Sequence, residues 1–154
     1  MDICTVSLSG HREVERASEI EVRLEILLHD RITQKDYVEF LIGRDGEFDL
    51  LAASVIRRAV RRYGYGNTSL ILVLPYMYRD NEHSYLDYYD DVEVCLESSN
   101  VHYKSAIQVR NRSMIDRSDL VVCCIQRKSG GAYKTVQYAL QQGKQVRNLS
   151  DSEL

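Results

Sequence analysis

The sequence predicts an α/β fold, with a doubly wound, mostly parallel sheet of about five strands and helices on both faces. Short runs rich in Leu, Ile and Val alternate with longer stretches in which apolar residues recur at helical spacing. Several short runs are apolar almost throughout, which is typical of strands covered on both faces. Strands and helices that alternate in this way indicate a parallel sheet. The length of 154 residues fits one domain, so residues 1–154 are expected to form a single unit.

The first half of the chain supplies two strands and two helices. Residues 3–8 form a short strand-like run, and residues 13–32 carry apolar side chains at helical spacing with charges on the opposite face. A second strand is expected at 37–42, and a helix at 48–63 follows it. Four arginines fall largely off the apolar face of this helix and are interpreted as a solvated surface: Arg57, Arg58, Arg61 and Arg62.

The second half begins with a continuous apolar strand at 69–74, which Pro75 ends. Residues 76–99 are polar and rich in Tyr, with one possible short strand at 92–96. The remaining expected elements are a helix at 104–117, a strand at 120–125, a helix at 132–142 and a strand at 145–149.

Composition excludes some classes of function. No apolar run reaches the ~20 residues that span a bilayer, and no secretory signal is visible, so a cytoplasmic protein without a membrane partner is expected. The formal net charge of −3 makes nucleic acid an unlikely partner on this evidence alone. No Cys/His spacing indicates a metal site, and no cofactor is certain. The four cysteines are interpreted as buried thiols, with neighbours Cys123 and Cys124 on opposite faces of a strand.

The strongest functional signal is Gly130-Gly131, which lies between an expected strand and an expected helix. A glycine pair lets the backbone approach a ligand, and the N–H groups of the helix start favour a phosphate. Thr135 could add a hydroxyl donor in the first helical turn. Lys134 is interpreted either as a further phosphate contact or as a surface residue.

Clusters of Gly and polar residues follow other expected strands as well. The four clusters, at 9–12, 43–47, 75–78 and 127–131, should meet at one edge of the sheet, where ligands of parallel sheets bind. The resulting candidate ligand-binding residues outside the last cluster are Gly10, His11, Arg12, Gly43 and Gly46.

Three charged side chains have competing interpretations. Arg110 shares a helix face with apolar residues and therefore needs a phosphate, a substrate carboxylate or an internal acid as partner. Glu47 either binds a ribose diol or simply favours the start of its helix. Asp45 is interpreted as a helix N-cap or a turn residue.

The Tyr-rich segment leaves two hypotheses open. Its aromatic side chains could stack on a base or cover the site, or they could form a surface loop or subunit contact. The residues concerned are Tyr76, Tyr78, Tyr85, Tyr88 and Tyr89.

Several short motifs follow one another along the chain. They are Ser9-Gly10-His11-Arg12, Gly43-x-x-Gly46-x-Phe48-Asp49, Leu72-Val73-Leu74-Pro75-Tyr76, Arg110-Asn111-Arg112-x-Met114, Ser118-Asp119, Ser129-Gly130-Gly131-Ala132 and Tyr138-Ala139. Taken together, these motifs resemble a group of small bacterial proteins in the SLOG superfamily, close to its YpsA-like branch. The superfamily also contains LOG-type phosphoribohydrolases and DNA-processing protein A. The resemblance implies a Rossmann-like fold, a nucleotide or nucleotide-derived ligand, and, by analogy, a homodimer.

LOG-type enzymes carry a Pro-Gly-Gly-x-Gly-Thr-x-x-Glu loop, and an Arg four residues before a Met that corresponds to Arg110. Aligned without gaps, the catalytic Glu of that loop falls on Gln137. A Gln can hydrogen-bond ribose hydroxyls but cannot act as a base. The sequence therefore favours binding or sensing of a nucleotide-derived ligand, such as an ADP-ribose-like molecule, over catalysis. The alternative is an N-glycosidic-bond hydrolase or transferase in which Glu47 and Arg110 are catalytic. A DNA-interacting protein is a third hypothesis.

Overall fold

The computed structural model describes residues 1–77 and 85–150, and it contains one parallel sheet in the order β4-β3-β2-β1-β5-β6. The strands in this described part are β1 (Ile3–Gly10), β2 (Tyr37–Ile42), β3 (Thr68–Leu74), β4 (Asp91–Val94), β5 (Leu120–Cys124) and β6 (Gln145–Asn148). The helices are α1 (Ala17–Gln34), α2 (Glu47–Tyr63), α4 (Leu96–Ser99), α5 (Tyr103–Asp116) and α6 (Gly131–Gln141).

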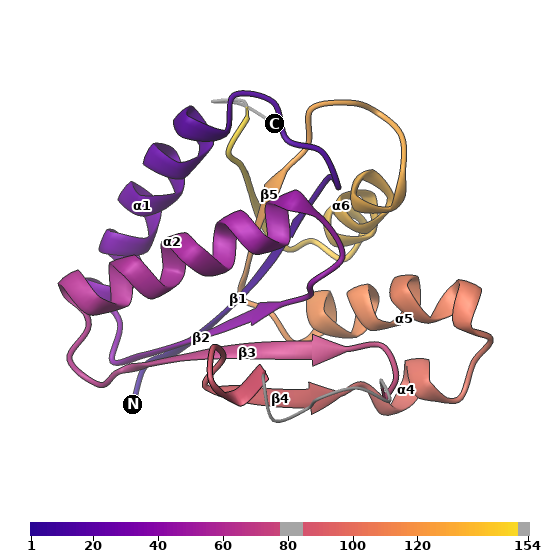
Figure 1. Ribbon diagram of the computed structural model, residues 1–154, viewed down its shortest axis with the longest axis horizontal. Coiled ribbons are helices and arrows are strands. Elements are labelled where there is room, and N and C mark those ends of the chain that lie inside the picture. Colours follow the sequence, from indigo (N-terminus) through magenta and orange to yellow (C-terminus); the bar gives the residue numbers. More distant parts are fainter. Residues whose placement is uncertain (78–84, 151–154) are drawn as a thin grey trace.

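Helices cover both faces of the sheet (Figure 1). On one face, α1 and α2 pack on alternate strand residues such as Val6, Phe40 and Leu72. On the other face, α5 and α6 cover the intervening positions, including Leu41 and Val121. The alternation arises because successive strand side chains point to opposite sides. The predicted fold class is confirmed, with six strands in the described part rather than about five.

The additional strand is β4, which was expected only as a possible strand at 92–96. Its backbone pairs with β3 in parallel, with Leu72 opposite Val92 and Leu74 opposite Val94. Its side chains are only partly buried because it lies at the edge of the sheet. The sequence therefore shows little of the hydrophobic pattern that identifies the central strands.

The first helix begins later than the pattern predicts. Residues 13–16 are not helical, and Arg16 adopts a left-handed conformation with φ 56° immediately before α1. Three hydrogen bonds hold this segment to the start of α2 and to the loop after β5. In one of them, Gln126 Nε2 donates to the Glu15 carbonyl at 2.7 Å. The Val14 N–H donates to Glu47 Oε2 at 3.0 Å, and the Glu15 N–H donates to Gln126 Oε1 at 2.9 Å. These tertiary contacts take the place of the first helical turn.

Two predictions about composition can be compared with the structure. Cys123 and Cys124 lie on opposite faces of β5, and all four cysteines are buried free thiols. Among the described residues, no helix combines the length and the apolar character that a membrane span requires.

Candidate functional site

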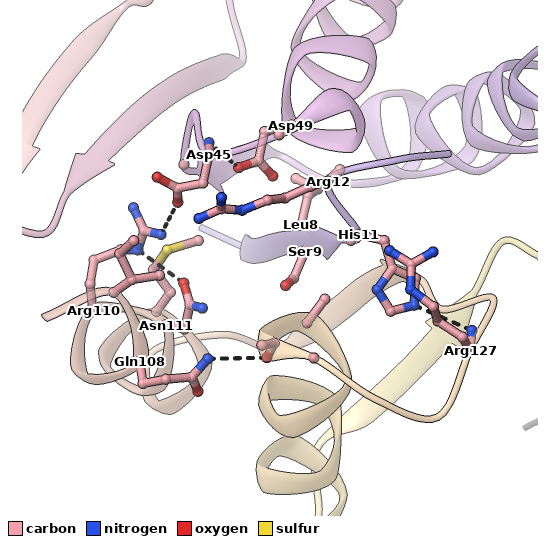
Figure 2. A pocket seen from close by; sticks show the side chains of 18 of the residues that line it. Leu8, Ser9, His11, Arg12, Asp45, Asp49, Gln108, Arg110, Asn111 and Arg127 are labelled. Carbon is pink, nitrogen blue, oxygen red and sulfur yellow. Dashed lines mark hydrogen bonds and ion pairs between the residues drawn. The ribbon is translucent and has the colours of Figure 1, made fainter. Parts of the chain in front are cut away.

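A cavity of about 450 Å³ lies beyond the carboxyl ends of β1, β2 and β5. Its walls come from the loop after β1, the loop after β2, one face of α5, and the start of α6 with the loop before it (Figure 2). This is the edge at which parallel α/β sheets bind ligands, because the loops that follow the strands meet there. Its polar lining residues include Ser9, His11, Arg12, Asp45, Asp49, Lys104, Gln108, Arg110, Asn111 and Arg127.

Arg110 is the most deeply buried charged side chain of the cavity, with 2% of its surface exposed. Its guanidinium donates from Nη1 to the Val73 carbonyl at 2.9 Å and from Nε to Asn111 Oδ1 at 3.0 Å. A short, charge-assisted hydrogen bond joins Nη2 to Asp45 Oδ2. Of the three partners predicted for Arg110, the structure supplies the internal acid. A buried guanidinium requires such partners because desolvating it alone is prohibitively unfavourable.

The hydrogen bonds continue from α5 to α6. Asn111 receives a hydrogen bond from Arg110 and donates from Nδ2 to Thr135 Oγ1 at 3.1 Å. The Thr135 hydroxyl donates in turn to the Gly131 carbonyl at 2.9 Å. Thr135 was predicted to bind phosphate, but it is buried and does not line the cavity. Its hydroxyl fastens α6 to α5 instead.

Five predicted glycines line the cavity, and three of them, Gly10, Gly43 and Gly46, are packed too closely for a side chain. A Cβ at Gly43 would lie 2.9 Å from Arg110 Nη1 and 3.0 Å from Asp45 Oδ2, so the ion pair occupies that space. A Cβ at Gly10 would overlap the ring of Phe48, and one at Gly46 would lie 2.5 Å from the Arg12 Cα. These positions let the loops close tightly around the cavity, whatever ligand it holds.

Gly130 differs because its conformation, not its neighbours, requires glycine. It has φ 91° and ψ 178°, a region essentially restricted to glycine, and no other described residue lies within 4 Å of the place of a Cβ. Gly130 is the N-cap of α6, and within the described ranges no side chain caps this helix. The first hydrogen bond to its carbonyl comes from the Lys134 N–H, so the N–H groups of the first turn have no intrahelical acceptor.

His11 is almost fully buried and holds the loop before α6. Its Nε2 accepts a hydrogen bond from the backbone N–H of Arg127 at 3.3 Å. Burial lowers the pKa of His11, and the nearby Arg127 charge lowers it further. The ring is therefore neutral at pH 7 and acts as a hydrogen-bond acceptor, so its geometry indicates positioning of the loop rather than attraction of an anion.

The cavity is more positive than the protein as a whole. Four cationic side chains line it, Arg12, Lys104, Arg110 and Arg127, against the two carboxyl groups of Asp45 and Asp49. In the described part of the chain, Arg12, Lys104 and Arg127 have no ion pair within 4.0 Å. Figure 2 shows the Arg12 side chain extending across the cavity from the loop after β1. These cations are available to an anionic ligand.

Asp49 lies in the first turn of α2 with only 8% of its surface exposed. Burial raises its pKa to about 6, and repulsion from Asp45 acts in the same direction. The Asp45 N–H, which donates to Asp49 Oδ2 at 2.9 Å, and the Arg110 charge both oppose the rise. Asp45 is not the N-cap of α2, since that position belongs to Gly46. Its carboxylate is engaged by Arg110 instead.

Glu47 and Gln137, which the sequence put forward for ribose or catalysis, do not line the cavity. Glu47 is exposed, and its Oε2 accepts a hydrogen bond from the Val14 N–H. A step of two residues along a helix turns a side chain by about 200°. Asp49, two positions further on, therefore faces the cavity and Glu47 does not.

The described part of the predicted cluster at 75–78 and three of the tyrosines also lie elsewhere. Pro75, Tyr76 and Met77 do not line the cavity, and Tyr78 falls outside the described residues. Three other tyrosines of the segment pack near α2 (Tyr85, Tyr88 and Tyr89). Arg57 lies 4.1 Å above the ring of Tyr88, Arg44 lies 5.0 Å above that of Tyr85, and Tyr89 is buried in the core. The structure thus gives these three tyrosines packing roles.

Several lining residues were not named as ligand-binding candidates from the sequence, although Asp45 and Arg127 belong to two of the predicted clusters. They are Asp45, Asp49, Lys104, Gln108, Asn111 and Arg127. Helical phase offered a signal for some of them. Lys104, Gln108 and Asn111 follow one another at spacings of four and three along α5, on the side that also presents Ile107 and Met114 to the cavity. Gln108 donates to the Gly131 carbonyl at 3.2 Å and so joins α5 to the start of α6.

A second hollow, of about 570 Å³, lies between α1 and β6. It is lined by Arg23, Arg31 and Arg147 among others, and Arg23 donates to the Leu149 carbonyl at 2.7 Å. Although slightly larger, it lies away from the loops that follow β1, β2 and β5 and contains neither a glycine loop nor a helix start. The cavity at the strand ends is therefore the better candidate site.

Comparison with known proteins places the fold. No protein-family model and no curated protein gave a significant match. Among solved structures, DNA processing protein A from Streptococcus pneumoniae matches with a TM-score of 0.65 and 15% identity over 94% of this chain. The same protein from Helicobacter pylori matches with a TM-score of 0.64 and 17% identity, again over 94% of this chain. The chain shares the fold of DNA processing protein A.

This chain covers 49% of the Streptococcus pneumoniae protein and 64% of the Helicobacter pylori protein, so it spans less than two thirds of either. The comparison therefore supports the Rossmann-like fold that the motif resemblance implied. At 15–17% identity, the similarity establishes the fold and no activity.

One prediction about partners is corrected by this comparison. Nucleic acid was judged an unlikely partner because the net charge is −3. DNA processing protein A from Helicobacter pylori, which has this fold, binds single-stranded DNA. Net charge is a poor guide because the local charge of a site decides what it attracts, and this cavity has more cations than acids.

The raised pKa of Asp49 predicts a pH-dependent stability. Between about pH 4 and pH 6 the native state holds a proton that the unfolded chain has lost, so the free energy of unfolding falls as pH rises. The stability that the protonated Asp49 side chain provides, relative to the ionised one, is fully present below about pH 4 and is lost as pH rises through 6. A shift of about two pKa units corresponds to about 3 kcal/mol.

Urea denaturation of the wild type and of Asp49→Asn from pH 4 to pH 7.5 measures this contribution. As pH rises, the unfolding free energy of the wild type should fall relative to that of Asp49→Asn, by up to about 3 kcal/mol. Two stability curves that stay parallel over this range would show that Asp49 titrates normally.

Proposed function

We propose that the cavity binds a nucleotide or nucleotide-derived ligand, with a phosphate seated at the start of α6. The main support is the uncapped helix start at Gly130 and Gly131, which lines a cavity in which cations outnumber acids. The glycine-only conformation of Gly130 leaves open space in front of the helix. First-turn N–H groups and the helix dipole favour an anion at that position.

The rest of the cavity suits the remainder of a nucleotide. Its volume of about 450 Å³ falls within the usual range for small-molecule sites. Leu8, Ile107 and Met114 contribute apolar surface against which a base can pack. Arg12 and Arg127 can donate charge-assisted hydrogen bonds to phosphate oxygens. These features favour a binding or sensing module for an ADP-ribose-like or similar ligand. From the length and the sequence motifs we further propose that residues 1–154 form a single domain related to the YpsA-like branch.

Charge reversal at Arg127 tests this proposal. Binding of AMP and ADP-ribose, measured by isothermal titration calorimetry at pH 7.5, should weaken about tenfold or more in Arg127→Glu, because a cation that faces the phosphate becomes an anion. Arg61→Glu is the matched control, because Arg61 is exposed on α2 and does not line this cavity. The affinity of this variant for both ligands should equal that of the wild type. Equal weakening in both variants, or no binding to the wild type, would contradict the proposal.

A second candidate is the binding of a single-stranded nucleic acid through the same cavity. It is favoured by the shared fold with a protein that binds single-stranded DNA and by an aromatic surface at the start of α5. Tyr103 is 63% exposed, and its ring lies 4.6 Å from the ring of His102 at a 30° tilt. Lys104, the next residue, lines the cavity. Exposed rings beside cations are typical of surfaces on which successive bases stack.

Tyr103→Ala separates this candidate from the binding of a free nucleotide. Affinity for a labelled oligo(dT) or oligo(U) of about 15 nucleotides, measured by fluorescence anisotropy, should fall about fivefold or more, because a stacked base contributes ~1–3 kcal/mol. Affinity for AMP should not change. Tyr65→Ala, which removes a similarly exposed tyrosine from the turn after α2, is the control. No salt-sensitive oligonucleotide binding by the wild type would eliminate this candidate.

A further inference from the structure

Asp49 has a carboxylate oxygen that the protein leaves without a partner. Oδ2 accepts the Asp45 N–H, whereas Oδ1 has no hydrogen bond within the described part of the chain. That part also contains no fully buried side-chain oxygen or nitrogen without a partner. Oδ1 must therefore be accessible, and because Asp49 lines the cavity, this oxygen opens into it.

The two acids of the cavity, Asp45 and Asp49, lie together on the loop after β2 and the start of α2. Arg110 is bound to Asp45 and the Arg12 side chain extends across the cavity towards both acids (Figure 2), whereas Arg127 belongs to the loop before α6. Lys104 belongs to α5. A phosphate is favoured at the start of α6. An ionised carboxylate can only accept hydrogen bonds, so a ligand group that contacts Asp49 Oδ1 must be a donor.

Helix capping alone does not explain why a buried, ionisable Asp stands at position 49. An acid near the start of a helix can accept a backbone N–H, as Asp49 does from Asp45. That bond uses a single oxygen, which an uncharged Asn or Gln would also supply. Asp49 is 8% exposed, so keeping it ionised costs desolvation. An exposed acid, Glu47, already interacts favourably with the positive end of the α2 dipole. A second ionised oxygen toward the cavity is the feature that capping leaves unexplained.

We infer that Asp49 accepts a hydrogen bond from a ribose hydroxyl, so that the cavity selects ribonucleotides over 2′-deoxyribonucleotides. This inference rests on the proposed nucleotide site and assigns its sugar specificity. A carboxylate that accepts a ribose 2′-hydroxyl is a recurrent device at nucleotide sites of parallel sheets. When the ligand lacks that hydroxyl, a buried acceptor loses a partner, and this gives strong discrimination.

The test uses matched pairs of ligands: AMP, GMP, CMP and UMP against dAMP, dGMP, dCMP and dUMP. Isothermal titration calorimetry at pH 7.5 gives the ratio of deoxy to ribo dissociation constants. For the base that binds most tightly, we expect a ratio of at least about ten in the wild type, as a charge-assisted hydrogen bond is worth ~1.5–3 kcal/mol. In Asp49→Asn the ratio should fall at least about fivefold, and in Asp49→Ala it should approach one.

Glu47→Gln is the matched control. It neutralises the neighbouring acid of the same helical turn, which does not line the cavity, and should leave the ratio unchanged. A wild-type ratio near one, with both ligands bound, would overturn the sugar assignment and leave the nucleotide site intact. A ratio in Asp49→Ala as high as that of the wild type would also overturn the sugar assignment and leave the nucleotide site intact. If none of the eight nucleotides binds to the folded wild type, the proposed function itself fails.

Discussion

The burial of the Arg110 guanidinium is the constraint on which the candidate site depends. A charge this deep needs its partners, and they come from separate segments: Asp45 in the loop after β2, the Val73 carbonyl in β3, and Asn111 beside it in α5. Asn111 in turn donates a hydrogen bond to Thr135 in α6. One side chain thereby holds three walls of the cavity in register, and the absence of a side chain at Gly43 provides the space for it.

Because Arg110 is satisfied from within, the other cations are left for a ligand. The protein is acidic overall, yet Arg12, Lys104 and Arg127 converge on the edge of the sheet that presents an open helix start. The two acids lie together at the loop after β2 and the start of α2, where Asp45 is held by Arg110 and Asp49 keeps one oxygen exposed to the cavity. An open helix start in one wall and a carboxylate oxygen in another fit a ligand with a phosphate at one end and hydroxyl groups at another.

The sequence predicted the fold well because the alternation of apolar strands and amphipathic helices depends on local pattern. It located eight residues that line the cavity, among them Gly10, Gly130 and Arg110. It could not identify the partner of Arg110, since Asp45 lies 65 positions away and only folding brings them together. It put forward Glu47, the last residue of the 43–47 cluster, and did not single out Asp49, which lies inside the expected helix. Asp49 faces the cavity because it lies about 200° further round α2 than Glu47.

A crystal structure of the protein with AMP at millimolar concentration tests the central claim most directly. We expect the phosphate within hydrogen-bond distance of the first-turn N–H groups of α6, with Arg12 or Arg127 against it and the ribose facing Asp49. Because Arg110 is already satisfied, its bonds to Asp45 and Val73 should persist in the complex. A nucleotide seated in the hollow between α1 and β6, or a phosphate that displaces Asp45 from Arg110, would contradict this arrangement.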